Sequence, residues 1–125
     1  MNACNPNDPV NLRFQCLHGL GHAVVFSLEY NLFKSLSWCD LLGSSWDQSS
    51  CYGGAFMENI TAIDKTKRFL SKNDPHFPCS VADERYKSQC YVMQTSRMFE
   101  MGLSVAHVLE ECKKAGSHRV QCMQR

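Results

Sequence analysis

Two histidines, His18 and His22, lie four residues apart in the segment Cys16-Leu17-His18-Gly19-Leu20-Gly21-His22. On an α-helix, residues four apart lie one above the other on the same face. Both imidazole rings could therefore bind a single metal ion, because neutral histidine is a common ligand of zinc and other transition metals. Two ligands do not complete such a site, so a third donor is needed from elsewhere in the chain.

A second segment of similar layout supplies a candidate for that third donor. When Cys51 is aligned on Cys16, Met57 falls opposite His22 and Glu58 follows one residue later. If the helices of the two segments stack, Glu58 comes close to the histidine pair. Two histidines and one carboxylate with open positions suit zinc or non-haem iron. The expected cofactor is thus a divalent transition metal, zinc, iron or copper, and the predicted metal ligands are His18, His22 and Glu58.

Simple packing is the alternative interpretation of the histidine pair, since imidazoles among glycines can also hydrogen-bond between helices. Gly19 follows His18 where a metalloprotease helix carries glutamate, so the chain lacks the His-Glu-x-x-His base. Nucleophile-elbow, phosphate-loop and haem-attachment motifs are also missing from the sequence. The sequence consequently predicts no catalytic residue and leaves open whether the protein is an enzyme.

Other residues with metal-binding side chains receive structural interpretations. A methionine stripe at helical spacing could suggest copper but is more often core filling. Of the other histidines, His107 and His118 are isolated and are expected at the surface or at a helix cap, whereas His76, between two prolines of the insertion, is expected to be exposed in a loop. The methionines are Met57, Met93, Met98 and Met101.

Eight cysteines are the strongest feature of the chain. An even number at regular spacing in a small chain indicates a disulfide framework formed in an oxidising compartment. No Cys-x-x-Cys is present, which argues against a zinc ribbon or an iron–sulfur site. The predicted pairs are Cys4/Cys16, Cys39/Cys51, Cys79/Cys90 and Cys112/Cys122, with separations of 12, 12, 11 and 10 residues.

The elements that must position these residues are predicted to be helices. The second cysteines of the pairs recur after 35, 39 and 32 residues, the size of one helical hairpin in a stacked repeat array. The predicted fold is all-α, a short α-solenoid of disulfide-stapled helical-hairpin repeats. Residues 1–125 are predicted to form a single domain of about three hairpin units, each bounded by a cysteine pair.

Helix boundaries follow from capping and breaking residues. The first expected helix is capped by Asp8 and has Pro9 at its first position, and the second has Leu32, Leu36, Cys39 and Leu42 on one face. A polar loop over residues 40–50 follows, and a third helix opens at Cys51. After an irregular insertion over residues 73–78, we expect a helix capped by Ser80 and stopped by Gly102, and a final helix over residues 104–114.

Glycines inside two of these helices predict close contacts. Gly19 and Gly21 lie within the first helix, and Gly53 and Gly54 lie early in the third. Each glycine costs a helix about 1 kcal/mol relative to alanine. We therefore expect some group to approach the first helix closely, and the glycines would let a ligand or substrate come near its backbone.

Cysteine-stapled hairpins of this period resemble the Sel1-like repeat proteins, a branch of the tetratricopeptide-like superfamily that includes secreted, cysteine-rich bacterial members. The resemblance covers nearly the whole chain at the level of layout, and it implies a stacked array of helical hairpins. Separately, the segments 16–22 and 51–58 are similar to a class of uncharacterised bacterial proteins in which a cysteine precedes an i, i+4 histidine pair on a helix. That second resemblance implies no chemistry.

Composition narrows the choice of partner and compartment. The net charge is +1, 20% of residues are charged, and no long run of one sign occurs. Nucleic acid is therefore not expected as a partner. No apolar run of membrane-spanning length and no signal peptide is visible. Because the cysteines indicate an oxidising compartment, we expect a secreted or periplasmic protein whose leader is absent from this sequence, with either a longer parent chain or a frayed last unit.

Two functions remain after these exclusions. The first is an extracytoplasmic, disulfide-stabilised helical-repeat module that binds a protein or small-molecule ligand on the surface lined by its first helices. The second is a metal-dependent enzyme or metal carrier with a site at His18 and His22, and with Glu58 as a further ligand or general base.

Overall fold

The computed structural model describes residues 4–124. They divide into two compact units, one ending at Arg68 and one beginning at Phe69. All regular structure in the described residues is helical, and disulfides staple the helices in hairpin-like pairs. The all-α, disulfide-stapled fold is thus confirmed, whereas the single domain of three hairpin units stays a prediction.

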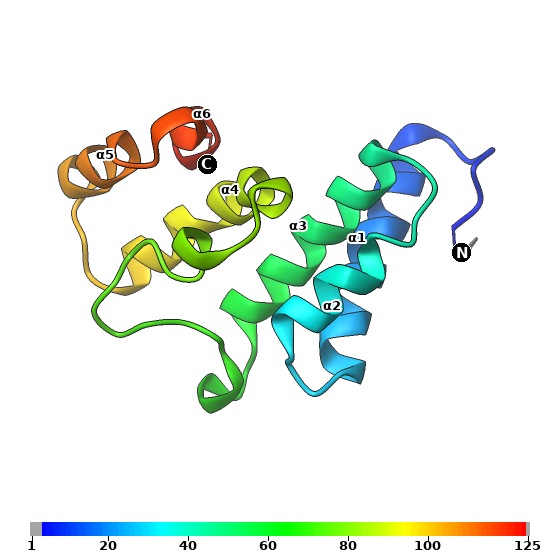
Figure 1. The fold of residues 1–125 in the computed structure, drawn as a ribbon, viewed down its shortest axis with the longest axis horizontal. Helices are drawn as coiled ribbons and strands as arrows, with labels where there is room; N and C mark the ends of the chain where they lie inside the picture. Colours follow the sequence, from blue (N-terminus) through cyan, green and yellow to red (C-terminus); the bar gives the residue numbers. More distant parts are fainter. Residues whose placement is uncertain (1–3, 125) are drawn as a thin grey trace. The chain divides into compact units, whose positions relative to one another are not determined.

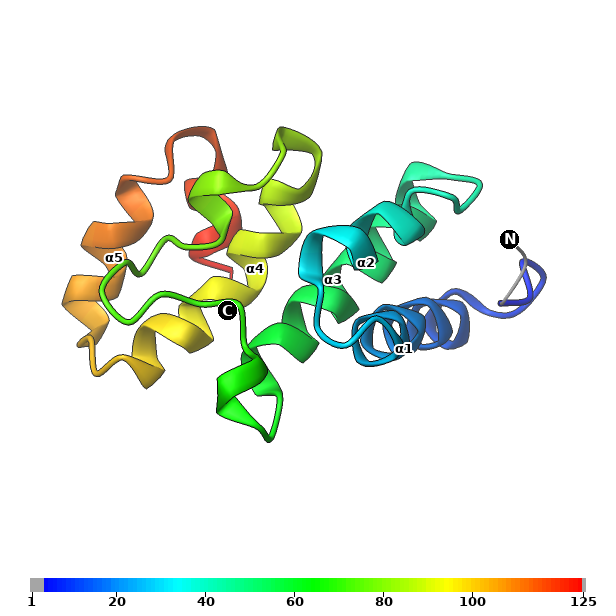
Figure 2. The ribbon, with the colours of Figure 1, turned by 60° about the horizontal axis from the view of Figure 1, so that its bottom comes forward.

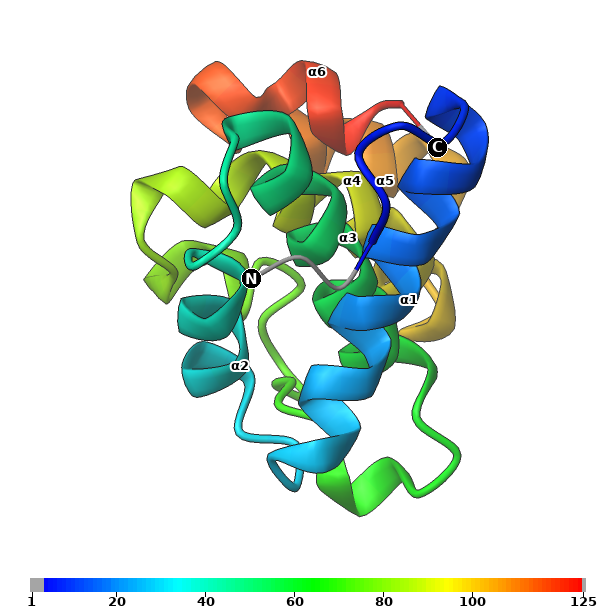
Figure 3. The same ribbon diagram turned by 90° about the vertical axis from the view of Figure 1, so that its right-hand side faces the viewer.

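The first unit contains three α-helices, α1 (Val10–Ser27), α2 (Leu32–Cys39) and α3 (Ser45–Thr61), followed by a short 3-10 helix, η1 (Lys65–Lys67). α1 and α3 lie side by side (Figure 1 and Figure 3), and α2 packs against both. The core of the unit is apolar, and burying each large aliphatic or aromatic side chain in it contributes about 1.5–3 kcal/mol. Its fully buried members include Leu17, Val25, Leu36 and Phe56.

Glycines bring α1 and α3 into close contact. A Cβ atom at Gly21 would lie 2.7 Å from the backbone nitrogen of Ala55 and 3.0 Å from Cα of Gly54. One at Gly54 would lie 2.8 Å from the carbonyl carbon of His18. The predicted close approach is therefore confirmed at Gly21, where the approaching group is a helix. At Gly19 a Cβ would meet nothing within 4 Å.

Two predicted helix starts in this unit are wrong. α1 begins at Val10 with Pro9 in the N-cap position and no side-chain cap, so Asp8 is not the cap. α3 begins six residues before Cys51, because the Ser44 hydroxyl accepts a hydrogen bond from the backbone N–H of Asp47. Half of the expected polar loop is therefore the first part of α3.

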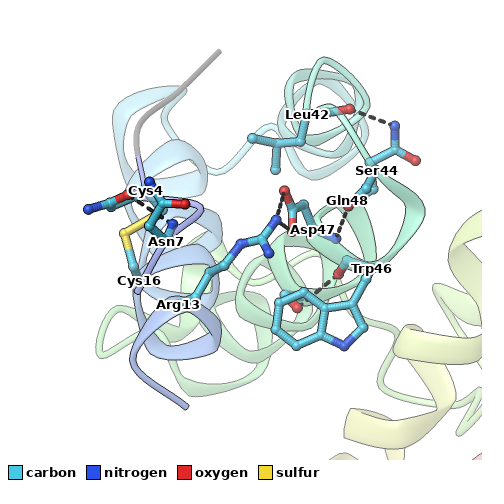
Figure 4. Close-up of polar contacts among 11 residues, drawn as sticks. Cys4, Asn7, Arg13, Cys16, Leu42, Ser44, Trp46, Asp47 and Gln48 are labelled. Atoms are coloured by element: carbon cyan, nitrogen blue, oxygen red, sulfur yellow. Dashed lines mark hydrogen bonds and ion pairs between the residues drawn. A yellow bond between two sulfur atoms is a disulfide. The ribbon is translucent and has the colours of Figure 1, made fainter. Parts of the chain in front are cut away.

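A polar clasp joins the beginnings of α1 and α3 (Figure 4). Arg13 Nη2 donates to both carboxylate oxygens of Asp47, at 2.6 and 2.7 Å. The guanidinium carbon of Arg13 also lies 5.6 Å from the centre of the Trp46 ring. Both members of the ion pair are only partly exposed, at 26% and 15%, so the clasp stabilises the helix pair more than an open surface ion pair would.

The turn between α1 and α2 has an unusual backbone. Glu29 and Tyr30 have φ angles of 55° and 66°, in the left-handed region that side chains other than glycine rarely adopt. The N–H of Tyr30 donates to the carbonyl of Val25 at 2.8 Å, which closes the end of α1. This conformation determines where the Tyr30 side chain points.

The second unit contains α4 (Glu84–Glu100), α5 (Val105–Lys113) and the short α6 (Arg119–Cys122) (Figure 2). α4 is capped by Asp83, so the predicted cap at Ser80 is wrong; Ser80 lies in the 3-10 turn Cys79–Val81. Gly102, with a φ of 91°, ends α4 as predicted. Ser104 caps α5 through its hydroxyl, also as predicted.

Residues 73–78 form no helix, which confirms the predicted irregular insertion. The insertion is held by Gln94, whose side chain is fully buried in α4. Gln94 Nε2 donates to the carbonyl oxygens of Pro75 and Phe77 at 2.6 and 3.1 Å. A buried amide thereby replaces the hydrogen bonds that a helix would have given these two carbonyls.

The four disulfides have the predicted partners: Cys4–Cys16, Cys39–Cys51, Cys79–Cys90 and Cys112–Cys122. Each closes a loop of 10–12 residues, which stabilises the folded state by about 3 kcal/mol in the chain-entropy model. All but the first pair have both sulfurs in the core. Across the described part of the chain, no helix is both long and apolar enough to cross a membrane.

Candidate functional site

α1 brings His18 and His22 together as the spacing predicted. Their Nε2 atoms lie 3.3 Å apart, and the ring centres are separated by 5.0 Å. Two imidazole nitrogens thus face each other on one side of α1. This side also faces α3, because the two helices are packed together through Gly21 and Gly54.

α3 contributes Glu58, the carboxylate that the alignment of the cysteines placed near the histidines. Its Oε1 lies 2.8 Å from Nδ1 of His22. Its Oε2 accepts a hydrogen bond from the hydroxyl of Tyr30 at 2.8 Å. Because a carboxylate only accepts, Nδ1 of His22 carries the shared proton, and in the neutral ring Nε2 keeps its lone pair.

Tyr30 is a site residue that the sequence analysis missed. Its position depends on two consecutive left-handed residues, for which Glu29 and Tyr30 give no sequence signal. The hydrogen bond to Glu58 is the main cause of a raised pKa at Tyr30, and desolvation and the negative charges of Glu58 and Asp64 raise it further. The phenol therefore stays protonated near neutral pH and remains a donor to the carboxylate.

Met57, which the alignment placed opposite His22, contacts the other histidine of the pair. Its Sδ atom lies 3.4 Å from Nε2 of His18, and the side chain is half-buried. Met93 and Met98, by contrast, are buried in the second unit, as core filling requires. The alignment that placed Met57 opposite His22 was the available signal for a contact with the histidine pair.

The cluster is open to solvent on one side. The His22 and Glu58 side chains are 28% and 20% exposed, so a small ion can reach them. Two aromatic side chains continue the same surface: the ring of Phe14 lies 5.5 Å from that of His18 and 6.3 Å from that of Trp46. The accessible donors therefore lie at the edge of an exposed aromatic patch.

Among residues 4–124, no group of three or more histidine, cysteine, aspartate or glutamate side chains is arranged to hold a metal ion. His18, His22 and Glu58 do not form such a group because both carboxylate oxygens of Glu58 are already hydrogen-bonded, one to His22 and the other to Tyr30. The metal site at His18, His22 and Glu58 accordingly stays a prediction.

The second unit contains a cavity of about 440 Å³, lined by His76, Lys87, Tyr91, Lys114 and His118 among others. His76 Nδ1 lies 3.0 Å from the hydroxyl of Tyr91, and its Nε2 lies 3.4 Å from Oε2 of Glu111. His118 stacks on Tyr91, and its Nε2 lies 2.6 Å from Oε1 of Glu84. With its side chain only 15% exposed, His76 is not the exposed loop residue that the sequence predicted, whereas His118 stands at the N-cap position of α6, one of the two places expected for it.

Burial and neighbouring charged groups shift two pKa values around this cavity. Burial is the main cause of the raised pKa of Tyr91, with a smaller effect from the charge of Asp74. The pKa of Glu111 is lowered, first by the hydrogen bond from Lys114 and then by His76. His107, the other histidine expected at the surface or at a helix cap, is exposed at the start of α5, where its N–H donates to Ser104 Oγ at 3.2 Å.

Comparisons of the chain with protein-family models, with curated proteins and with solved structures find no match in any of the three.

Proposed function

We propose that this protein is an extracytoplasmic metal-binding module. His18 and His22 supply the ligands, and Glu58 is the carboxylate of the site. Four disulfides support the compartment, since such bridges persist in oxidising environments. Two of them stabilise the small unit that carries the site: one ties Cys4 to α1, and the other ties α2 to α3.

The observation that carries this proposal is the separation of the two imidazole nitrogens. Nitrogens about 2.0–2.1 Å from one tetrahedral ion lie about 3.3–3.4 Å from each other. His18 Nε2 and His22 Nε2 are 3.3 Å apart. The pair is thus spaced to bind one ion without a rearrangement of α1, and its partial exposure gives the ion a path from solvent.

The site also lacks competition from thiolates. Every cysteine is disulfide-bonded, and a bridged sulfur is a poor ligand compared with a thiolate. Metal taken up by the folded, oxidised protein is therefore expected at imidazole, and specifically at the pair in α1.

Native mass spectrometry of the oxidised protein tests the proposal. The protein is loaded in separate samples with Zn²⁺, Cu²⁺ and Cu⁺, and the bound metal is counted. We expect one tightly bound ion, which is lost in the His18→Ala/His22→Ala variant and kept in the control His107→Ala. Absence of bound metal in the unmodified protein, or equal loading of the double variant, would refute the proposal.

A binding function for a small anionic ligand is a second candidate, and we propose it for the cavity of the second unit. Lys87 and Lys114 provide positive charge there, and Tyr91 provides an aromatic wall. A Sel1-like relationship would fit this candidate, because stacked helical hairpins present binding surfaces. Thermal unfolding with added inorganic phosphate and simple dicarboxylates, compared with the Lys114→Glu variant, tests it. We expect an anion to raise the melting temperature of the unmodified protein but not that of the variant. If none of the anions stabilises the unmodified protein, this second proposal is refuted.

A further inference from the structure

We infer that Met57 is the third metal ligand and that the site is selective for Cu⁺, with Glu58 acting from outside the coordination sphere to orient His22. The inference rests on the proposed metal-binding function and specifies its ligand set and its ion.

The position of the Met57 sulfur supports its role as a ligand. Sδ of Met57 and Nε2 of His22 lie 3.4 and 3.3 Å from the same atom, Nε2 of His18. A nitrogen at about 2.05 Å and a sulfur at about 2.3 Å from one tetrahedral ion would be about 3.5 Å apart. Both contacts of His18 therefore have the lengths expected between ligands of a common ion.

The contacts of Glu58 support a role outside the coordination sphere. Its two oxygens hold the Nδ1 side of His22 and the hydroxyl of Tyr30. A metal-bound histidine commonly donates its other ring N–H to a carboxylate, which fixes the tautomer and the orientation of the ring. The Tyr30–Glu58–His22 chain has this arrangement, with the lone pair of His22 Nε2 directed toward His18 and away from Glu58.

The donor set indicates which ion is preferred. A thioether is a soft, neutral ligand that favours Cu⁺, whereas hard cations prefer carboxylate and carbonyl oxygen. Two neutral imidazoles and a thioether leave the single positive charge of Cu⁺ uncompensated by any ligand. The carboxylate of Glu58, one residue from Met57, supplies a negative charge close to the ion without binding it.

Within residues 4–124, the sulfur atoms other than that of Met57 offer no equivalent site. Every cysteine is bridged, and Met93 and Met98 are buried in the core of the second unit. Met57 differs from these because it is partly exposed and in contact with a histidine nitrogen. A single sulfur donor is therefore expected around a bound copper ion.

Anaerobic titration with Cu⁺, supplied as its acetonitrile complex so that no thiol reductant reaches the disulfides, tests the inference. Affinity is measured by competition with a chromogenic Cu⁺ chelator, and Zn²⁺ affinity is measured in parallel. The variants are Met57→Leu, its matched control Met101→Leu, and Glu58→Gln. X-ray absorption at the copper edge reports whether sulfur is bound, and circular dichroism checks that each variant is folded.

We expect Met57→Leu to bind Cu⁺ at least about tenfold more weakly and to lose the sulfur signal, since loss of even an outer-shell partner typically costs about 10–100-fold. Its Zn²⁺ affinity and the Cu⁺ affinity of Met101→Leu should be unchanged. Glu58→Gln should weaken both ions by similar factors while the copper–sulfur signal persists.

Unchanged Cu⁺ affinity in Met57→Leu would overturn the assignment of the third ligand, and so would loss of an oxygen donor from copper in Glu58→Gln. In either case the metal-binding function would survive if His18→Ala/His22→Ala still abolished binding. Failure of the unmodified protein to bind any ion would instead refute the proposed function itself.

Discussion

Substituting alanine for Gly19 and for Gly54 should change the free energy of unfolding in opposite directions, although both glycines lie in helices of the first unit. At Gly19 a Cβ has open space, so Gly19→Ala is expected to raise the free energy of unfolding by about 0.5–1 kcal/mol through helix propensity. At Gly54 the added Cβ would lie 2.8 Å from the carbonyl carbon of His18. Ordinary carbon–carbon contact needs about 3.5–4.0 Å, so α1 and α3 must separate by about 1 Å.

The cost of that separation can be estimated. A gap of about 0.5–1 Å forfeits a quarter to a half of the dispersion energy of each contact, and overpacking of this kind typically costs about 1–3 kcal/mol or more. The propensity gain of about 1 kcal/mol offsets part of this cost. Because the required separation of about 1 Å lies at the upper end of that range, the upper end of the overpacking cost applies. A net loss of about 2 kcal/mol is therefore expected for Gly54→Ala, which corresponds to a drop in Tm of roughly 8–16 °C for a unit of this size.

Thermal unfolding of the oxidised protein, followed by circular dichroism, compares the two variants directly. Gly54→Ala should melt below the unmodified protein, and Gly19→Ala should melt at or above it. The same substitution in the same type of helix thus serves as its own control for propensity. If the Gly54→Ala protein has the same melting temperature as the Gly19→Ala protein, α1 and α3 are not in contact through Gly54.

Two further predictions concern the second unit. Gln94→Leu should lower the free energy of unfolding by about 2–3 kcal/mol, because the carbonyls of Pro75 and Phe77 lose their buried donor; a melt equal to that of the unmodified protein would contradict this. Glu111→Gln should destabilise the protein above pH 4.5, the ordinary pKa of glutamate, and the difference should disappear as the pH falls through the lowered pKa of the folded state. The sign follows because the folded state favours the ionised carboxyl, and melts across the acid range measure it; a difference independent of pH would contradict the ion-pair explanation.

The sequence was informative where a feature depends on local spacing. The disulfide partners follow from separations of 10–12 residues, and the face shared by His18 and His22 follows from a four-residue step on a helix. The early start of α3 was also within reach, because Ser44 and Asp47 have the spacing of a helix capping box. Reading the segment as a polar loop overlooked that signal.

Features that depend on tertiary contacts were beyond such reasoning. Tyr30 reaches Glu58 through two left-handed residues that no local pattern indicates. His76 and His118 are packed against Tyr91, from which they lie 15 and 27 residues away in the sequence. The orientation of Met57 toward His18 depends on how α3 lies along α1, which the sequence alone does not specify.

The order of the disulfides along the chain has a consequence for biogenesis. Eight cysteines can pair in 105 ways, yet in this protein each odd-numbered cysteine is joined to the next one along the chain. If the chain is exported as proposed, every second cysteine therefore meets its correct partner before the following pair emerges. An oxidase acting on the emerging chain could complete the framework in sequence, without an isomerase to correct it.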